Sequence, residues 1–136
     1  SNDIYGTRVC SYETASQVLE VSDDLIRSGL VEILQDGDTI LGFYSLKDVL
    51  NLQSTSIIEL GHLFVSSNHV KRGIGTILFQ RAVSKAKFYG AKTMKWISDP
   101  DSVGFYIKMG SVLIDRAENI LNPSVDVSIM ECDLSA

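Results

Sequence analysis

The clearest pattern in the chain is an apolar stripe with helical spacing over residues 74–89. Apolar side chains recur there every three or four positions, at Ile74, Leu78, Phe79, Ala82, Val83 and Ala86. This spacing is typical of a helix that buries one face in a core, and Gly90 is a natural stop. A second, weaker helical pattern covers residues 13–28 and ends at Gly29.

Between and after these helices, shorter runs predict strands. Residues 30–34 and 39–46 flank an Asp36-Gly37 turn, which is a strong signal for a β-hairpin. Residues 57–65 are almost continuously apolar, which predicts a strand buried on both faces. Further elements are expected as strands at residues 93–97, 111–114 and 125–132 and as a short helix at residues 103–109, after a capping turn at 99–102. This order predicts one mixed α/β domain.

Composition narrows the class of protein. The chain has 136 residues, of which 45% are apolar and 21% charged, as in a globular domain. Cys10 and Cys132 are too few for a disulfide framework, and His62 and His69 are too few for a usual zinc site. A net charge of −5 without a basic run argues against nucleic-acid binding, and no apolar stretch could span a bilayer. We therefore expect a cytoplasmic protein without a metal.

A glycine-containing loop at residues 70–76 follows the predicted buried strand and opens the long helix. Glycine lets the backbone turn tightly, and the first N–H groups of a helix attract phosphate. The loop lacks the third glycine of a dinucleotide fingerprint and the Gly-Lys-Ser/Thr of a P-loop, which argues against a dehydrogenase and an NTPase. The alternative to a phosphate-binding loop is a simple tight turn without a ligand.

Two motifs together resemble a known family. Leu63-Phe64-Val65, followed after seven residues by Gly73-Ile74-Gly75, resembles the central motif of the GNAT superfamily of acyltransferases. Residues 99–110, which read Asp-Pro-Asp-Ser-Val-Gly-Phe-Tyr-Ile-Lys-Met-Gly, are similar to the family's later motif. The resemblance implies a three-layer α-β-α fold with a mostly antiparallel mixed sheet, splayed at the cofactor site, in a single domain over residues 1–136. The family's amino-terminal strand and helix are not recognisable before residue 13, so we expect a truncated start or completion by a partner chain.

The resemblance also implies acetyl-CoA as cosubstrate and no metal. Backbone groups of Phe64 and Val65 would pair with the pantetheine amides like an added strand, and residues 71–76 would hold the pyrophosphate. Val70 stands where the family loop usually has Gln or Arg, and Asp101 stands where it often has Asn. The residues assigned to the cofactor are Leu63, Phe64, Val65, Val70, Lys71, Arg72, Gly73, Ile74, Gly75, Thr76, Asp101, Phe105, Tyr106 and Lys108.

Direct acetyl transfer needs a base that deprotonates the amine and an acid that meets the leaving thiolate. Tyr106 matches the family's tyrosine and is the candidate acid; the alternative is a core aromatic. Glu59 is the first candidate base, because a carboxylate on an apolar strand is costly unless it has a partner. His62 is the second, since imidazole titrates near neutrality. The two differ in strand parity, so they should face opposite sides unless a bulge intervenes. For each, the alternative is a structural polar group.

The sequence therefore predicts an N-acetyltransferase that moves an acetyl group from acetyl-CoA to a primary amine of a small molecule, peptide or protein. The alternative is a catalytically inactive acyl-CoA-binding sensor or partner module of the same fold. The expected partner is the amine substrate, with neither nucleic acid nor membrane, and the chain is expected to be a monomer or homodimer.

Overall fold

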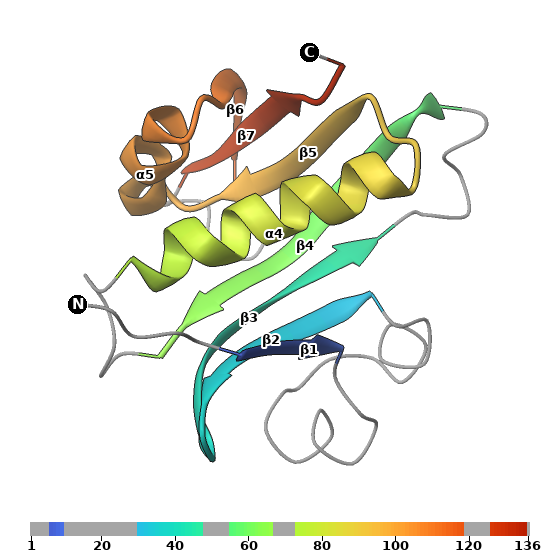
Figure 1. Cartoon of the computed structure of the whole chain (residues 1–136). Helices are drawn as coiled ribbons and strands as arrows, with labels where there is room; N and C mark the ends of the chain where they lie inside the picture. The colour runs from blue at the N-terminus through green and yellow to red at the C-terminus, as the bar shows by residue number, and fades with distance from the viewer. Residues whose placement is uncertain (1–5, 10–29, 48–54, 67–72, 119–125, 136) are drawn as a thin grey trace. The chain divides into compact units, whose positions relative to one another are not determined.

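The computed structural model describes residues 6–9, 30–47, 55–66, 73–118 and 126–135. The chain forms two compact units, of which unit 1 comprises Ser1–Lys47 and Leu60–Lys85, and unit 2 comprises Asp48–Glu59 and Ala86–Ala136. The elements, drawn in Figure 1, are β1 (Gly6–Val9), β2 (Val31–Asp36), β3 (Thr39–Lys47), β4 (Ile57–Val65), α4 (Ile74–Phe88), β5 (Thr93–Ser98), the 3-10 helix η3 (Pro100–Ser102), α5 (Val103–Lys108), β6 (Val112–Glu118) and β7 (Asp126–Asp133). They confirm the predicted mixed α/β class. The helix predicted over residues 13–28 lies outside the described residues, and the single domain stays a prediction.

Unit 1 contains strands in the order β1-β2-β3-β4. The predicted hairpin is confirmed, because β2 and β3 pair antiparallel on either side of Gly37, whose φ is +57°. β1 pairs antiparallel with β2, from Gly6 opposite Gln35 to Val9 opposite Glu32. The sequence did not predict β1, since a four-residue segment that begins with glycine is too short to show alternation. A strand is therefore present before residue 13, and the truncated start stays a prediction.

The helix α4 lies across one face of these strands (Figure 1). Its predicted apolar stripe is confirmed, because Ile74, Leu78, Phe79 and Ala82 are all buried. β2 and β3 are buried on both faces over most of their length. Burial of the stripe against a covered sheet accounts for the stability of α4 far better than its intrinsic propensity does.

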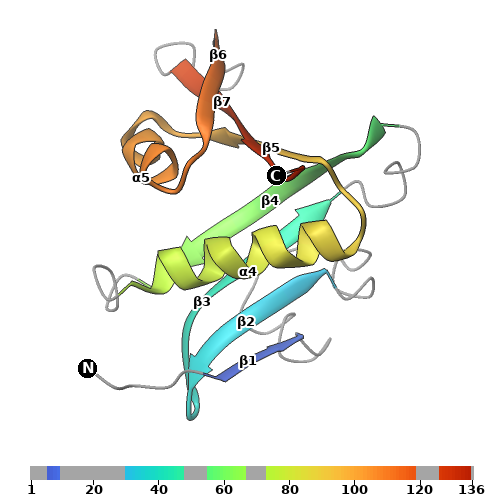
Figure 2. The same ribbon diagram turned by 45° about the horizontal axis from the view of Figure 1, so that its top comes forward.

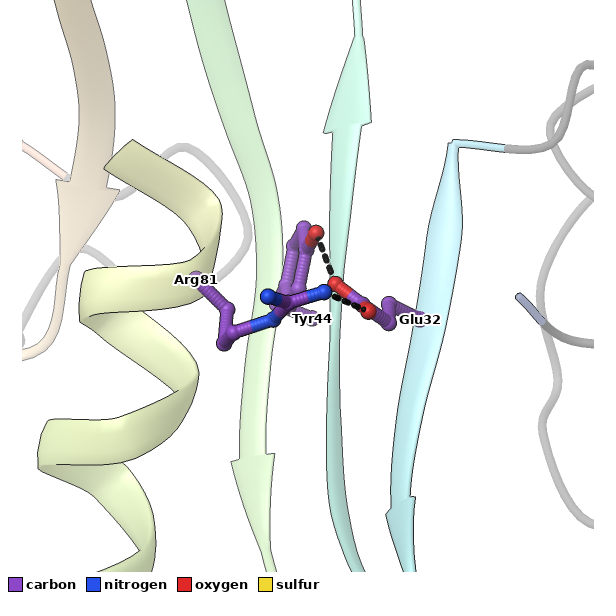
Figure 3. A network of polar contacts seen from close by, with 3 residues as sticks. All are labelled: Glu32, Tyr44 and Arg81. Atoms are coloured by element: carbon purple, nitrogen blue, oxygen red, sulfur yellow. Dashed lines mark hydrogen bonds and ion pairs between the residues drawn. The ribbon is translucent and has the colours of Figure 1, made fainter. Parts of the chain in front are cut away.

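A buried carboxylate ties α4 to the strands beneath it. Glu32 on β2 is 4% exposed, and Nη2 of Arg81 on α4 donates to its Oε2 at 2.5 Å. The Tyr44 hydroxyl on β3 donates to Oε1, also at 2.5 Å. Figure 3 shows the three side chains converging from helix and strands. Each carboxylate oxygen thus has a donor, which makes burial of this charge tolerable.

The partners of Glu32 decide its ionisation. Burial alone would raise the pKa of this carboxyl, but hydrogen bonds from Arg81 and Tyr44 and the charges of Arg81 and Lys85 together lower it below its ordinary value of 4.5. The hydrogen bond to Glu32 in turn raises the pKa of Arg81. The pair is therefore charged at neutral pH.

The end of β4 comes close to β3 at a glycine. A Cβ added to Gly42 would lie 2.4 Å from the carbonyl oxygen of Phe64 and 2.8 Å from Cδ1 of Leu78. The amide of Ser66 donates to the carbonyl of Leu41 at 2.8 Å, so the pairing continues just past β4. Only glycine at position 42 lets the strand end and α4 both approach this closely.

The extent of β4 is confirmed, but the predicted burial of this strand on both faces is wrong. Ile58 and Leu60 are buried, whereas residues 61–63 are half-buried and Phe64 is 52% exposed. The Phe64 ring instead lies against Phe43, with centroids 5.6 Å apart. An apolar sequence does not distinguish a strand that is covered on both faces from one whose end is only partly covered.

Unit 2 contains the order β4-β5-β7-β6, to which β4 contributes its first three residues. Ile57–Glu59 pair with β5 in parallel, and β7 is antiparallel to both β5 and β6. The short helix α5 contacts β6 and β7 (Figure 2). Its buried Tyr106 packs on Trp96, with ring centroids 4.9 Å apart. No helix within the described ranges is long and apolar enough to cross a membrane.

We predict that Gly42→Ala lowers the free energy of unfolding by about 1–3 kcal/mol, because the new methyl group overlaps the Phe64 carbonyl and must displace backbone. Urea denaturation of the purified variant measures this. The control is Gly104→Ala in α5, where an added Cβ has nothing within 4 Å and should cost nothing or stabilise. Equal unfolding free energies for Gly42→Ala and wild type would contradict the close approach.

We predict that Glu32→Gln costs about 1–3 kcal/mol at pH 7, because the charge-assisted bond from Arg81 is lost. The pKa of Glu32 in the folded state lies below 4.5, so its ionised form stabilises the fold above that pH. This contribution is lost as pH falls through the folded pKa, and the difference between wild type and variant should then narrow. Denaturation at several pH values between neutral and acid measures it.

The matched control is Glu131→Gln. Glu131 lies 3.8 Å from Lys95 in a pair whose side chains are 32% and 41% exposed, so its loss should cost no more than about 1 kcal/mol. A cost at Glu32 no larger than that at Glu131 would show that the buried network does not hold α4.

Candidate functional site

The first turn of α4 has backbone donors without an acceptor inside the helix. The carbonyl of Gly73 accepts from the amide of Ile77 at 3.1 Å, so Gly73 is an acceptor of this turn. The N–H groups of the next three residues have no acceptor within the helix, and the first turn contains no acidic residue. Gly73 has a φ of +79° and nothing within 4 Å of an added Cβ. This end of α4 therefore suits an anion.

The predicted phosphate loop is only partly described. Gly73, Ile74, Gly75 and Thr76 lie as the sequence analysis placed them, with Ile74 buried as the anchor of the helix start. Val70, Lys71 and Arg72 lie outside the described residues, as do Cys10 and His69.

The peptide groups at the end of β4 alternate between the edge that faces β3 and the opposite edge. The carbonyl of Phe64 is directed toward Gly42 on β3, and the amide of Ser66 also bonds to β3. Backbone groups alternate in direction along a strand, so those of Leu63 and Val65 project from the other edge. Within unit 1, β4 is the last strand in the order. The peptide groups of Leu63 and Val65 thus face away from β3, whereas the Phe64 carbonyl, expected to pair with a ligand, faces β3.

His62 is held by a residue that the sequence did not single out. Its Nδ1 lies 2.6 Å from Oγ of Ser45 on β3, and its ring centroid is 5.9 Å from that of Phe43. Burial lowers the pKa of His62 below its ordinary value of 6.5, and the charge of Lys47 lowers it further. The imidazole is therefore neutral at physiological pH.

Gly61 and His62 both lie close to the Ser45 side chain. A Cβ added to Gly61 would lie 3.0 Å from Ser45 Oγ, and the His62 ring reaches the same hydroxyl. Consecutive residues of a regular strand point to opposite faces, so the approach of both to one side chain is what a β-bulge at this position would produce. A bulge is the exception that the sequence analysis allowed for, and the sides that Glu59 and His62 face stay a prediction.

Glu59, the first candidate base, lies in unit 2. It is half-buried on the part of β4 that pairs with β5, opposite Lys95, whose own ion-pair partner is Glu131. Glu59 was chosen because burying an unpaired carboxylate costs free energy. Since this residue is only half-buried, that cost does not apply in full.

Tyr106 is fixed by its helix and by aromatic packing in unit 2. The Asp99 carboxylate caps the turn before α5, accepting from the amide of Ser102 at 3.0 Å and from its hydroxyl at 3.1 Å. Tyr106 is 7% exposed, and burial, with a smaller effect of the Asp99 charge, raises its pKa to about 12. The phenol therefore keeps its proton at neutral pH and can only donate it or share it in a hydrogen bond.

The other residues of the later motif also lie in unit 2. Phe105 is half-buried, with its ring centroid 5.2 Å from that of Tyr106, while Asp101 and Lys108 are exposed on η3 and at the end of α5. The two motifs of the sequence therefore fall in different units: Leu63–Val65 and Gly73–Thr76 in unit 1, the rest in unit 2. Burial raises the pKa of Cys132, so this thiol is not activated as a nucleophile.

Four residues that matter here were missed by sequence reasoning. Glu32 gave a signal, because it is the one charged residue among Leu30–Leu34, yet the signal was applied only to Glu59. Tyr44 and Arg81 gave none, since their role depends on a partner far away in the chain. Ser45 resembles any other small residue on a buried strand.

Comparison with known proteins agrees with this geometry. The family model described as the acetyltransferase (GNAT) family matches residues 5–111. Comparison with curated proteins gives no significant match. The fold is similar to that of the GNAT-family acetyltransferase of Streptococcus pneumoniae, with a TM-score of 0.77, 14% identity and coverage of 96% of this chain and 99% of that one.

Two further solved structures are similar over almost the whole chain. The ribosomal-protein-S18-alanine N-acetyltransferase of Escherichia coli has a TM-score of 0.75 and 12% identity, covering 98% of this chain and 96% of that one. The Salmonella typhimurium protein yncA, solved with its cofactor acetyl-CoA, has a TM-score of 0.75 and 14% identity at the same coverage, 98% and 96%. Identities this low show a shared fold. Since the family model spans most of the sequence, from the first strand through α5, the chain belongs to the acetyltransferase (GNAT) family.

Proposed function

We propose that the chain is an N-acetyltransferase that transfers the acetyl group of acetyl-CoA to a primary amine of a small molecule, peptide or protein. The observation that supports this proposal is the order of two backbone features in unit 1. The peptide groups of Leu63 and Val65 face away from β3, and Ile74, where α4 begins, follows Val65 by nine residues in the chain. An extended amide chain that ends in a diphosphate fits that order.

The contacts follow from the backbone. The peptide groups of Leu63 and Val65 would pair with the amides of pantetheine, as an added strand does. The first amides of α4 would hold the pyrophosphate, supported by the helix dipole. The likeness of yncA, solved with acetyl-CoA, supports this choice of cosubstrate. The ionised Glu32 and its partners hold α4 where these amides are presented.

Acetyl transfer needs a base for the amine and a donor for the leaving thiolate. A neutral amine must attack the thioester carbon, so a base has to take its proton first. Glu59 and His62 remain the candidates for this base. Tyr106, whose pKa is raised to about 12, would donate a hydrogen bond to the departing thiolate. The likeness of the S18-alanine N-acetyltransferase supports including protein amino groups among the acceptors.

We predict that Gly73→Glu abolishes acetyl-CoA binding in calorimetry. The new side chain adds a negative charge where the pyrophosphate would lie and forces a non-glycine residue into a φ of +79°. Gly90→Glu is the matched control at the other end of the same helix, with a φ of +91° and equally open surroundings. It should bind acetyl-CoA as wild type does. Retained affinity in Gly73→Glu would remove the start of α4 from the site.

We predict that Tyr106→Phe lowers kcat about tenfold or more and weakens acetyl-CoA binding less than that, because phenylalanine keeps the packing on Trp96 but loses the donor. Release of the free thiol over a panel of amines measures turnover. Unchanged kcat would exclude Tyr106 from the mechanism. Acetyl-CoA binding without thiol release in wild type would instead indicate the inactive acyl-CoA-binding module.

A further inference from the structure

We propose that Ser45 is a positioning residue that holds His62 so that Nε2 of the imidazole takes the proton of the acceptor ammonium group. This inference rests on the proposed acetyl transfer and decides between its two candidate bases. His62 directly precedes Leu63, the first of the two residues whose peptide groups face away from β3, and all of these residues lie in unit 1.

The imidazole is held in two ways. Ser45 Oγ lies 2.6 Å from Nδ1, and the Phe43 ring lies beside the imidazole at 5.9 Å. Ser45 is 0% exposed, so its hydroxyl is not presented to a substrate as a nucleophile. An acyl-serine intermediate is therefore not part of the proposal, and the contact with His62 is the use that the structure gives this hydroxyl.

Gly61 makes room for this arrangement. A Cβ at this position would lie 3.0 Å from Ser45 Oγ and 2.7 Å from Cε of Lys47. Glycine therefore allows the serine hydroxyl and the lysine stem to lie side by side next to His62. Lys47 is the charged side chain within the described part of unit 1 whose field acts on the imidazole.

The direction of the hydrogen bond decides which nitrogen does the chemistry. In a neutral imidazole one nitrogen carries hydrogen and the other a lone pair. If Nδ1–H donates to Ser45 Oγ, the lone pair is on Nε2. When Nε2 then takes a proton, the Nδ1–H bond to Ser45 is kept, so the ring does not have to turn.

The step balances as follows. An ammonium N–H bond breaks and its proton moves to Nε2, which leaves a lone pair on the amine. The amine nitrogen bonds to the acetyl carbon, the carbon–sulfur bond breaks, and sulfur leaves with the electron pair. The amine's second proton neutralises the thiolate, and His62 returns its proton to solvent. The low pKa of His62 keeps it ready to accept near neutral pH.

Nitrogen-15 NMR of the wild-type protein without substrate tests the positioning directly. The expected His62 signals are those of the tautomer with hydrogen on Nδ1. In Ser45→Ala this preference should be lost. A wild-type spectrum with hydrogen on Nε2 would overturn the proposal, whatever the activity.

Kinetics test the consequence. Ser45→Ala should lower kcat about tenfold with an unchanged dissociation constant for acetyl-CoA, and Ser45→Thr should recover part of it because the hydroxyl is kept. Ser128→Ala removes another buried serine, on β7, and should behave as wild type. Equal kcat for Ser45→Ala and Ser128→Ala would overturn the proposal.

The pH profile separates the rival bases. Lys47→Met removes the charge that lowers the pKa of His62, so the acid limb of kcat should move to higher pH, whereas Lys47→Arg should leave it in place. A limb that moves in Glu59→Gln but not in Lys47→Met would assign the base to Glu59 and overturn the role of His62. Failure of the acetyltransferase proposal looks different, because wild type itself would then release no thiol.

Discussion

The ionised Glu32 beneath α4 is the interaction on which the rest of unit 1 depends. An apolar stripe lets a helix lie on a sheet but leaves its rotation and sliding poorly determined. The bond from Arg81 to Glu32, with Tyr44 on the second oxygen, specifies one placement. A buried ion pair adds little net stability compared with an apolar replacement, but breaking it is costly. We infer that its main effect is to fix where the first amides of α4 point.

A second constraint acts on the strand that leads into this helix. Gly42 lets the Phe64 carbonyl come close to β3, and this contact sets the alternation of the backbone groups that follow. If the register of β4 against β3 were shifted by one residue, the peptide groups of Leu63 and Val65 would point at β3. They could then no longer pair with a ligand on the other side of β4. Gly42 on β3, which has no side chain, therefore orients the end of β4, and the carboxylate of Glu32 on β2 orients the start of α4. These are the two features proposed to bind acetyl-CoA.

Local patterns and distant contacts explain what the sequence could and could not predict. β4 and α4 were predicted almost residue for residue, because apolar runs and helical spacing are local properties. The roles of Tyr44 and Arg81 were not, since they lie 12 and 49 residues from Glu32 in the chain. Glu32 and Glu59 have the same sequence pattern, since each is a single carboxylate within an apolar strand. At Glu32 it marked a buried structural charge, whereas Glu59 is half-buried and its role stays a prediction.

The opposite pKa changes of His62 and Tyr106 suggest how a single reaction could use both. Burial favours the neutral form of each group, which lowers the pKa of an imidazole and raises that of a phenol. One environment yields an unprotonated base and the other a protonated donor at the same pH. Serine suits this scheme better than aspartate as the partner of His62. A carboxylate would stabilise the imidazolium and raise its pKa, whereas a neutral hydroxyl orients the ring and leaves the base free to work near neutrality.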